Sequence, residues 1–99
     1  MKVISVIGHK KSGKTTLVTQ LAKELSRTGK VGTVKSMIYH RFNPEDTDTG
    51  KHFDSGADIV TALTRDEFVM VSHNPSLTKA LDTLADNGMD FAIVEEIGR

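Results

Sequence analysis

The order of apolar and polar residues along the first third of the chain predicts a strand, a helix and a second strand. Lys2–Ile7 is mostly apolar and rich in β-branched residues, without strict alternation, which is typical of a central parallel strand covered on both faces by helices. Val31–Lys35 predicts a second strand, parallel to the first because a helix joins them. That helix is expected to end near Thr28-Gly29 and to place this apolar stripe in the core: Leu17, Val18, Leu21, Ala22 and Leu25.

The middle of the chain predicts a short helix followed by a β-hairpin. Asp46–Asp54 has the composition of a short helix that ends at Ser55-Gly56. Asp58–Thr64 and Glu67–Ser72 are two β-branched runs around Arg65-Asp66, which favours a hairpin or two closely linked strands. A helix through residues 59–63 is the alternative.

The last quarter of the chain predicts a helix and a final strand. Asn74-Pro75 supplies an N-cap and a proline for the first helical turn, and Asn87-Gly88 closes the helix. Phe91–Val94 is an apolar strand that delivers Glu95 and Glu96 at its C-terminal end. The core stripe of the helix is expected to be Leu77, Ala80, Leu81, Leu84 and Ala85.

A glycine-rich loop joins the first predicted strand to the first predicted helix. It matches the Walker A (P-loop) pattern of glycine, four variable residues, glycine, lysine and a hydroxyl residue, and its backbone N–H groups and the helix N-terminus form a cradle for phosphate. We expect Lys14 to reach the outer phosphates and Thr15 to bind the Mg²⁺ that accompanies a nucleotide. An ordinary glycine-rich turn is the alternative. The predicted nucleotide site comprises Gly8, His9, Lys10, Lys11, Ser12, Gly13, Lys14, Thr15 and Thr16.

A carboxylate at the tip of the last strand is the second candidate component of the site. Glu95 stands where a Walker B acid would orient Mg²⁺ or its water, and Glu96 is the alternative. The predicted catalytic residues are Lys14 and Glu95, and Thr15 and Glu95 are predicted to bind the magnesium ion.

Polar residues follow the second predicted strand, where ligands of parallel sheets commonly bind. Asp46, Asp48 and Asp54 either face the metal or an acceptor, or belong to a solvated acidic loop with local turns. His40 and His52 could complete a transition-metal site with them, but their spacing matches no fixed ligand pattern.

These elements predict an α/β fold, a three-layer P-loop NTPase-like sheet, mostly parallel, with flanking helices, in a single nucleotide-binding domain over residues 1–99. Ninety-nine residues are short for this fold, so the chain is either a minimal domain or one truncated at the C-terminus. Thirteen basic and thirteen acidic side chains give a formal net charge of zero, which offers no general attraction to nucleic acid or membranes. The absence of cysteine excludes a disulfide framework and a thiolate metal site, and the absence of a signal peptide favours the cytoplasm.

Together, several of these features resemble the molybdopterin-guanine dinucleotide biosynthesis protein B family, a branch of the P-loop NTPases. The features are the first strand and its loop, Val34-Lys35, His40, Asp48-Thr49 ahead of Ser55-Gly56-Ala57-Asp58, and Asp90–Glu95. The chain departs from the family at Glu96, where the family has glycine, and it stops at Arg99, whereas family members continue through further strands.

The resemblance implies a protein that binds GTP with Mg²⁺, hydrolyses it slowly at most, and assists a guanylyltransferase that attaches a guanosine nucleotide to molybdopterin. It also implies a homodimer, Asp48 near the metal and Glu95 as the Walker B acid. From direct reading of the residues the base stays open between guanine and adenine, since no Asn-Lys-x-Asp motif is present. Two other functions also remain open, a small-molecule kinase acting on a hydroxyl acceptor and a nucleotide-sensing module without turnover.

Overall fold

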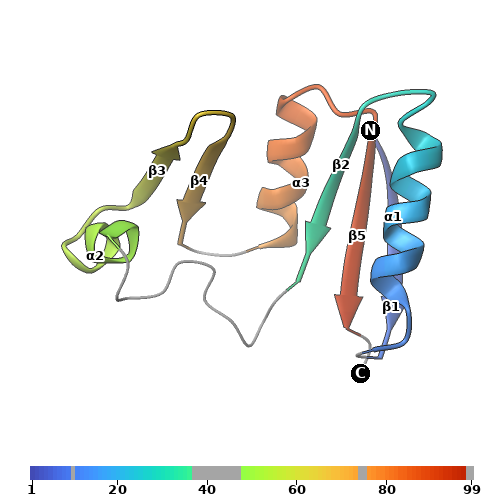
Figure 1. The fold of residues 1–99 in the computed structure, drawn as a ribbon, viewed down its shortest axis with the longest axis horizontal. Helices are drawn as coiled ribbons and strands as arrows, with labels where there is room; N and C mark the ends of the chain where they lie inside the picture. Colours follow the sequence, from blue (N-terminus) through green and yellow to red (C-terminus); the bar gives the residue numbers. More distant parts are fainter. Residues whose placement is uncertain (10, 37–47, 74–75, 98–99) are drawn as a thin grey trace. The chain divides into compact units, whose positions relative to one another are not determined.

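The structure is a computed structural model that describes residues 1–9, 11–36, 48–73 and 76–97. The elements in chain order are β1 (Lys2–Gly8), α1 (Lys14–Leu25), β2 (Val31–Lys35), α2 (Asp48–Asp54), β3 (Ile59–Leu63), β4 (Phe68–Ser72), α3 (Leu77–Asp86) and β5 (Phe91–Ile97) (Figure 1). They form two compact units, one made of Met1–Ser36 with Ser76–Arg99 and the other of Met37–Pro75.

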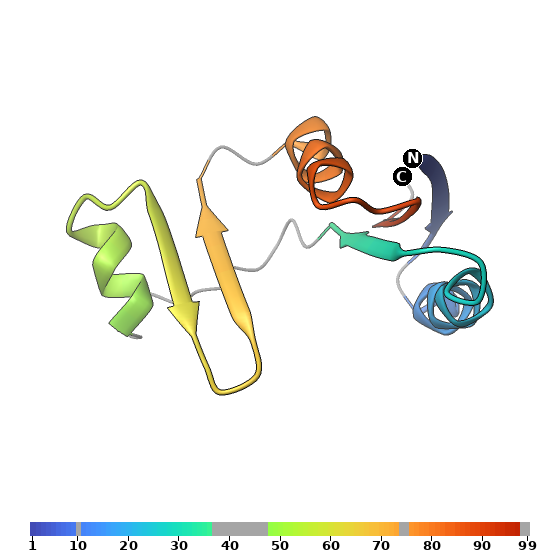
Figure 2. The ribbon, with the colours of Figure 1, turned by 90° about the horizontal axis from the view of Figure 1, so that it is seen from above.

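The first unit is a three-stranded parallel sheet between two helices. Its strand order is β1-β5-β2, so the last strand of the chain lies in the middle and pairs with both others. α1 and α3 lie on opposite faces of this sheet (Figure 2). The prediction of a three-layer α/β fold with a mostly parallel sheet is confirmed.

The core of this unit is centred on β5. Ile93 and Val94 are 0% and 1% exposed, and they point to opposite faces because side chains alternate along a strand. Ile93 packs with Val6 and Val18 on the α1 side. On the α3 side Gly32 leaves room for Leu84, because a Cβ at Gly32 would lie 2.6 Å from Leu84 Cδ2.

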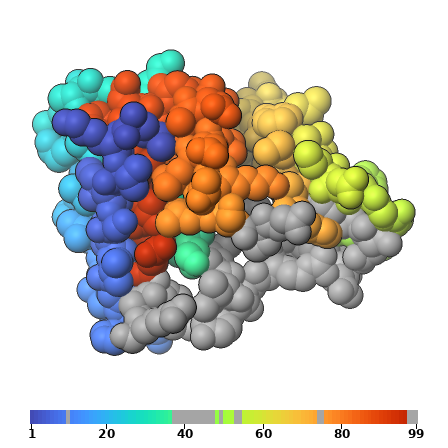
Figure 3. Space-filling view, turned by 180° about the vertical axis from the view of Figure 1, so that it is seen from behind, coloured from blue at the N-terminus to red at the C-terminus, as the bar shows by residue number. Residues whose placement is uncertain are grey.

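The expectation that the first strand is covered on both faces is wrong. β1 is an edge strand of the described sheet, and its Val3 and Ile7 are 48% and 64% exposed. α3 packs against β2 rather than β1, so β1 lies open beside α3 on the face seen in Figure 3. The apolar composition of β1 therefore does not mean that both of its faces are buried within the described residues of this chain.

Two residues of the expected core stripes are also exposed. Leu17 is 46% exposed because it lies at the margin of the α1 stripe, about 80° of helix rotation from Leu25. Leu77 is 44% exposed because it is the first residue of α3, where side chains lean past the helix N-terminus.

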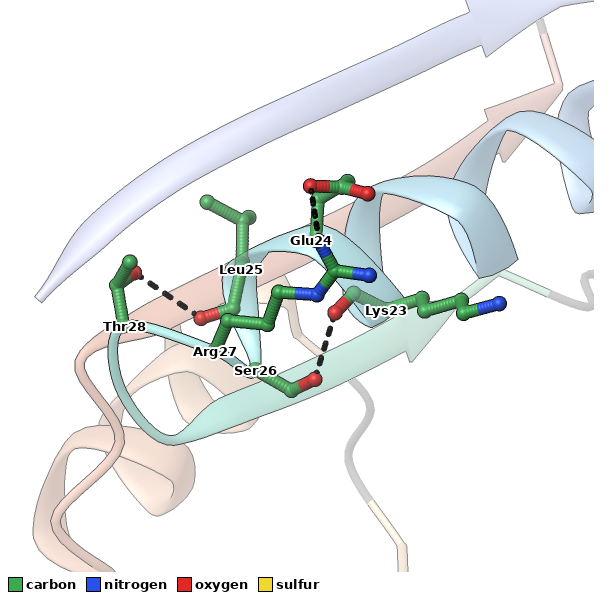
Figure 4. Close-up of polar contacts among 6 residues, drawn as sticks. All are labelled: Lys23, Glu24, Leu25, Ser26, Arg27 and Thr28. Atoms are coloured by element: carbon green, nitrogen blue, oxygen red, sulfur yellow. Dashed lines mark hydrogen bonds and ion pairs between the residues drawn. The ribbon is translucent and has the colours of Figure 1, made fainter.

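The helix ends differ from the expected ones for local reasons. α1 ends at Leu25, with Ser26 as its C-cap, and not near Thr28-Gly29. After it, the Ser26 and Thr28 hydroxyls donate to the carbonyls of Lys23 and Leu25 at 2.8 and 3.1 Å, while Arg27 lies 3.5 Å from Glu24 (Figure 4). These side-chain bonds satisfy the last carbonyls and allow a turn to replace further helix.

The N-cap of α3 is Ser76 and not Asn74, which lies outside the described residues. The Ser76 side chain accepts the Lys79 backbone N–H at 3.0 Å, a bond typical of a helix start. The other end is as expected, since Asn87 is the C-cap and Gly88 has a positive φ of 81°.

The second unit contains α2 and the β3–β4 hairpin. The strands are antiparallel, with Thr61 opposite Met70, and the Thr64 N–H donates to the Glu67 carbonyl at 2.9 Å in the turn. The hairpin prediction is confirmed, and a helix through residues 59–63 is wrong. Across the described ranges of both units, none of the helices has the length and apolar character needed to cross a membrane.

Candidate functional site

The loop between β1 and α1 is built for a reversal of the backbone. Gly13 has a φ of +87° and forms the N-cap of α1, and Lys11 has a φ of +61°. Glycine adopts the left-handed conformation without the steric cost that a Cβ brings. The Ser12 N–H donates to the His9 carbonyl at 3.2 Å and closes the turn.

The Lys14 side chain folds back over this loop. Its ammonium group donates to the carbonyls of Gly8 at 2.7 Å and His9 at 2.9 Å. Gly8 permits this path, because a Cβ there would lie 3.3 Å from Lys14 Cγ and 2.7 Å from Ser12 Oγ. An ammonium group has three donors. The two backbone bonds therefore fix the position of Lys14 and leave one N–H for an anion.

The first turn of α1 contains no acidic residue of its own. No side chain of the described residues caps its backbone N–H groups. Unpaired N–H groups and the helix dipole favour an anion at such an end. Thr16 lies in this turn with an exposed side chain, and its carbonyl accepts the Thr19 hydroxyl at 2.9 Å. The start of α1 and the Lys14 ammonium thus present positive charge together.

A hydrogen bond joins this turn to the middle of the sheet. The Thr15 hydroxyl donates to Glu95 Oε1 at 2.8 Å, across 80 residues of sequence. Glu95 is only 7% exposed, and a buried carboxylate is costly unless hydrogen-bonded or paired with a cation. The structure thus places the predicted Glu95 and Thr15 side by side beneath the loop.

The donor set fits Mg²⁺ that arrives with a nucleotide. A hydroxyl and a carboxylate are the hard oxygen ligands that Mg²⁺ prefers, and its other ligands are usually water and phosphate. Within the part of the chain that the structure describes, no group of three or more His, Cys, Asp or Glu residues could hold a metal ion alone. Thr15 and Glu95 are the side chains that would hold such an ion, and its positive charge would offset the charge of bound phosphate.

Glu96 lies on the other face of the sheet. In the parallel register it pairs with Ile7, one position beyond Glu95, and successive strand residues point to opposite sides. Of the two glutamates, Glu95 is therefore the one that contacts the start of α1.

The remaining predicted residues lie in the second unit or outside the described residues. Asp48 is exposed at the first position of α2 in the second unit, so its role at the metal stays a prediction. His52 lies exposed on the same helix. Lys10, His40 and Asp46 lie outside the described residues, and so does the side chain of Asp54.

Sequence reasoning missed how Lys14 is held. The His9 side chain is exposed, and it is the His9 carbonyl that accepts both Lys14 and Ser12. A backbone carbonyl gives no residue-type signal, so this role could only be read from the structure.

Two sequence comparisons find similar proteins. The sequence model of the family described as molybdopterin guanine dinucleotide synthesis protein B (MobB) matches residues 3–97. A Methanocaldococcus jannaschii protein named as a putative molybdopterin-guanine dinucleotide biosynthesis adapter protein is 33% identical over 96 residues, covering 96% of this chain and 40% of that protein.

Two solved structures share the fold. A MobB protein homolog from Bacillus stearothermophilus has a TM-score of 0.68 and 26% identity, over 97% of this chain and 56% of that one. Bacillus subtilis MobB has a TM-score of 0.71 over 97% of this chain and 61% of that one, and at 22% identity it shows the fold alone. The chain spans less than two thirds of the length of each of these relatives. Because the family model covers nearly all of the sequence, the chain belongs to the molybdopterin guanine dinucleotide synthesis protein B family.

Proposed function

We propose that this chain binds GTP with Mg²⁺ at the Gly8–Thr15 loop and acts as an accessory protein in the synthesis of molybdopterin guanine dinucleotide. In this proposal it works as a homodimer, its partner is the guanylyltransferase that attaches the guanosine nucleotide, and its own hydrolysis of GTP is slow or absent. The observation that carries the proposal is the Thr15–Glu95 hydrogen bond of 2.8 Å beside the positioned Lys14.

Triphosphate binding is supported by the charges at the loop. The Lys14 ammonium and the N-terminus of α1 carry positive charge. The buried Glu95 carboxylate accepts a hydrogen bond from the Thr15 hydroxyl, and these two oxygens are the kind of ligand that Mg²⁺ binds. Three components for a magnesium–triphosphate complex therefore lie together: a lysine, a helix N-terminus and an oxygen pair. The choice of guanine rests on the family, whose product contains a guanosine nucleotide.

Slow hydrolysis is supported by the position of arginine. An arginine beside the phosphates can raise the rate of nucleotide hydrolysis by orders of magnitude. In the described part of the first unit, Arg27 lies beyond the far end of α1 and pairs with Glu24. Residues 1–9, 11–36 and 76–97 therefore place no arginine at the loop.

Titration calorimetry tests the choice of nucleotide. GTP and ATP are each titrated into the protein, once with Mg²⁺ and once with excess chelator. We expect GTP to bind at least as tightly as ATP and both to bind more weakly without the metal. A tenfold or greater preference for ATP would argue against the proposed function.

Glu95→Gln is expected to reduce the gain in GTP affinity that Mg²⁺ provides by about tenfold, a typical loss for one charge-assisted contact. The amide oxygen can still accept the Thr15 hydroxyl, so the fold and the local geometry are retained while the negative charge is lost. The measurement is the ratio of dissociation constants with and without Mg²⁺. Glu96→Gln is the matched control, because Glu96 points to the other face of the sheet, and an equal effect in both variants contradicts the assignment.

A further inference from the structure

Lys35 is the last residue of β2 and lies directly beside Glu95 of the neighbouring strand β5. The parallel register pairs Lys35 with Glu95, and Glu95 with Val6 of β1. The C-terminal ends of β1, β5 and β2 lie at one edge of the sheet, beside the first turn of α1 (Figure 1). Neighbouring strands are about 4.8 Å apart, so Lys35 begins one strand away from the carboxylate that contacts Thr15.

Lys35 belongs to the face of the sheet that carries the loop. Val31 packs on the α1-side core with Ile93, whereas Gly32 faces Leu84 of α3. Alternation along β2 then places Thr33 and Lys35 on the α1 side. Glu95, two residues after Ile93, lies on this side as well.

The Lys35 ammonium is available to a ligand. Lys35 is exposed, and across the described ranges no hydrogen bond or ion pair occupies it. Lys14, by contrast, already donates to two backbone carbonyls. The sequence signal for Lys35 is weak, because a lysine at the end of a strand usually serves only solubility.

We propose that Lys35 binds the outermost phosphate of the bound triphosphate, on the side of Glu95 away from β1. This inference rests on the proposed nucleotide binding and adds a second side chain that recognises the third phosphate. Lys14 holds the triphosphate from the β1 side, Thr15 and Glu95 hold the metal in the middle, and Lys35 reaches over from β2. The contact exists with a triphosphate and is lost with a diphosphate, so Lys35 makes the site sensitive to which of the two is bound.

The test compares GTP with GDP, both with Mg²⁺, by titration calorimetry of the full chain. Lys35→Met keeps an unbranched side chain, one atom shorter, and removes its charge. It is expected to weaken GTP binding about tenfold and to change GDP binding less than about twofold. Lys35→Arg keeps the charge and is expected to retain most of the GTP affinity. Lys2→Met is the matched control, since Lys2 is an exposed strand lysine on the same face at the opposite edge.

The outcomes separate this inference from the proposed function. Equal weakening of GTP and GDP by Lys35→Met, or no weakening of either, overturns the role of Lys35 and leaves the nucleotide site standing. A wild-type protein that binds neither nucleotide contradicts both proposals. Thermal unfolding of each variant, recorded beside the titrations, is expected to match the wild type because Lys35 is exposed.

Discussion

Lys14→Ala is expected to reduce GTP affinity by about a hundredfold or more, beyond the loss that one ordinary charged hydrogen bond explains. Lys14 supplies the charge at the centre of the loop, and the carbonyls of Gly8 and His9 already hold its ammonium in place. The variant loses both the phosphate contact and this positioning. Titration calorimetry with GTP and Mg²⁺ measures the loss.

The fold is expected to survive this substitution, because Lys14 bonds to the loop and not to the core formed by Val6, Val18 and Ile93. Circular dichroism and the thermal midpoint check this point. Lys23→Ala is the control, since Lys23 lies exposed near the opposite end of the same helix and is expected to leave GTP affinity unchanged. Unchanged affinity in Lys14→Ala itself would overturn the assignment of the site.

Ile93→Ala is expected to lower the free energy of unfolding by about 3 kcal/mol, within the range for removing a large buried aliphatic side chain. Ile93 is 0% exposed on the middle strand, where it contacts Val6 of β1 and Val18 of α1. Its loss leaves a cavity between the sheet and the helix that carries the loop. Urea unfolding monitored by circular dichroism gives the value.

The matched control is Ile7→Ala on the neighbouring strand. Ile7 is 64% exposed, so the same exchange of side chains leaves no comparable cavity and is expected to cost less than about 1 kcal/mol. If both variants lost the same stability, Ile93 would not be the centre of the core.

The predictions from sequence agree best with the structure for features that depend on neighbouring residues. The loop, the hairpin and the Gly88 helix end each depend on a few neighbouring residues, and their predicted positions agree with the structure. The approach of Glu95 to Thr15 was also anticipated, although 80 residues separate them, because the order of elements in a parallel sheet brings strand ends to one edge.

Predictions failed where burial depends on distant packing. The composition of β1 cannot reveal that α3 packs against β2. The periodicity of α1 cannot reveal that Leu17, at the margin of the apolar stripe, is left exposed. The N-cap predicted at Asn74 is wrong, because the Lys79 N–H donates to the Ser76 hydroxyl and makes Ser76 the cap. The pairing of Lys35 with Glu95 required the register of a strand that lies 60 residues further along.

The position of β5 in the sheet has a consequence for biosynthesis. β1 and β2 do not pair with each other, and both take their described hydrogen-bonded neighbour from Phe91–Ile97. Domains fold as units during translation, and pairing between distant segments is slow. The first two strands therefore leave the ribosome before their shared neighbour has been synthesised, and the described parallel sheet can form only once Phe91–Ile97 has emerged.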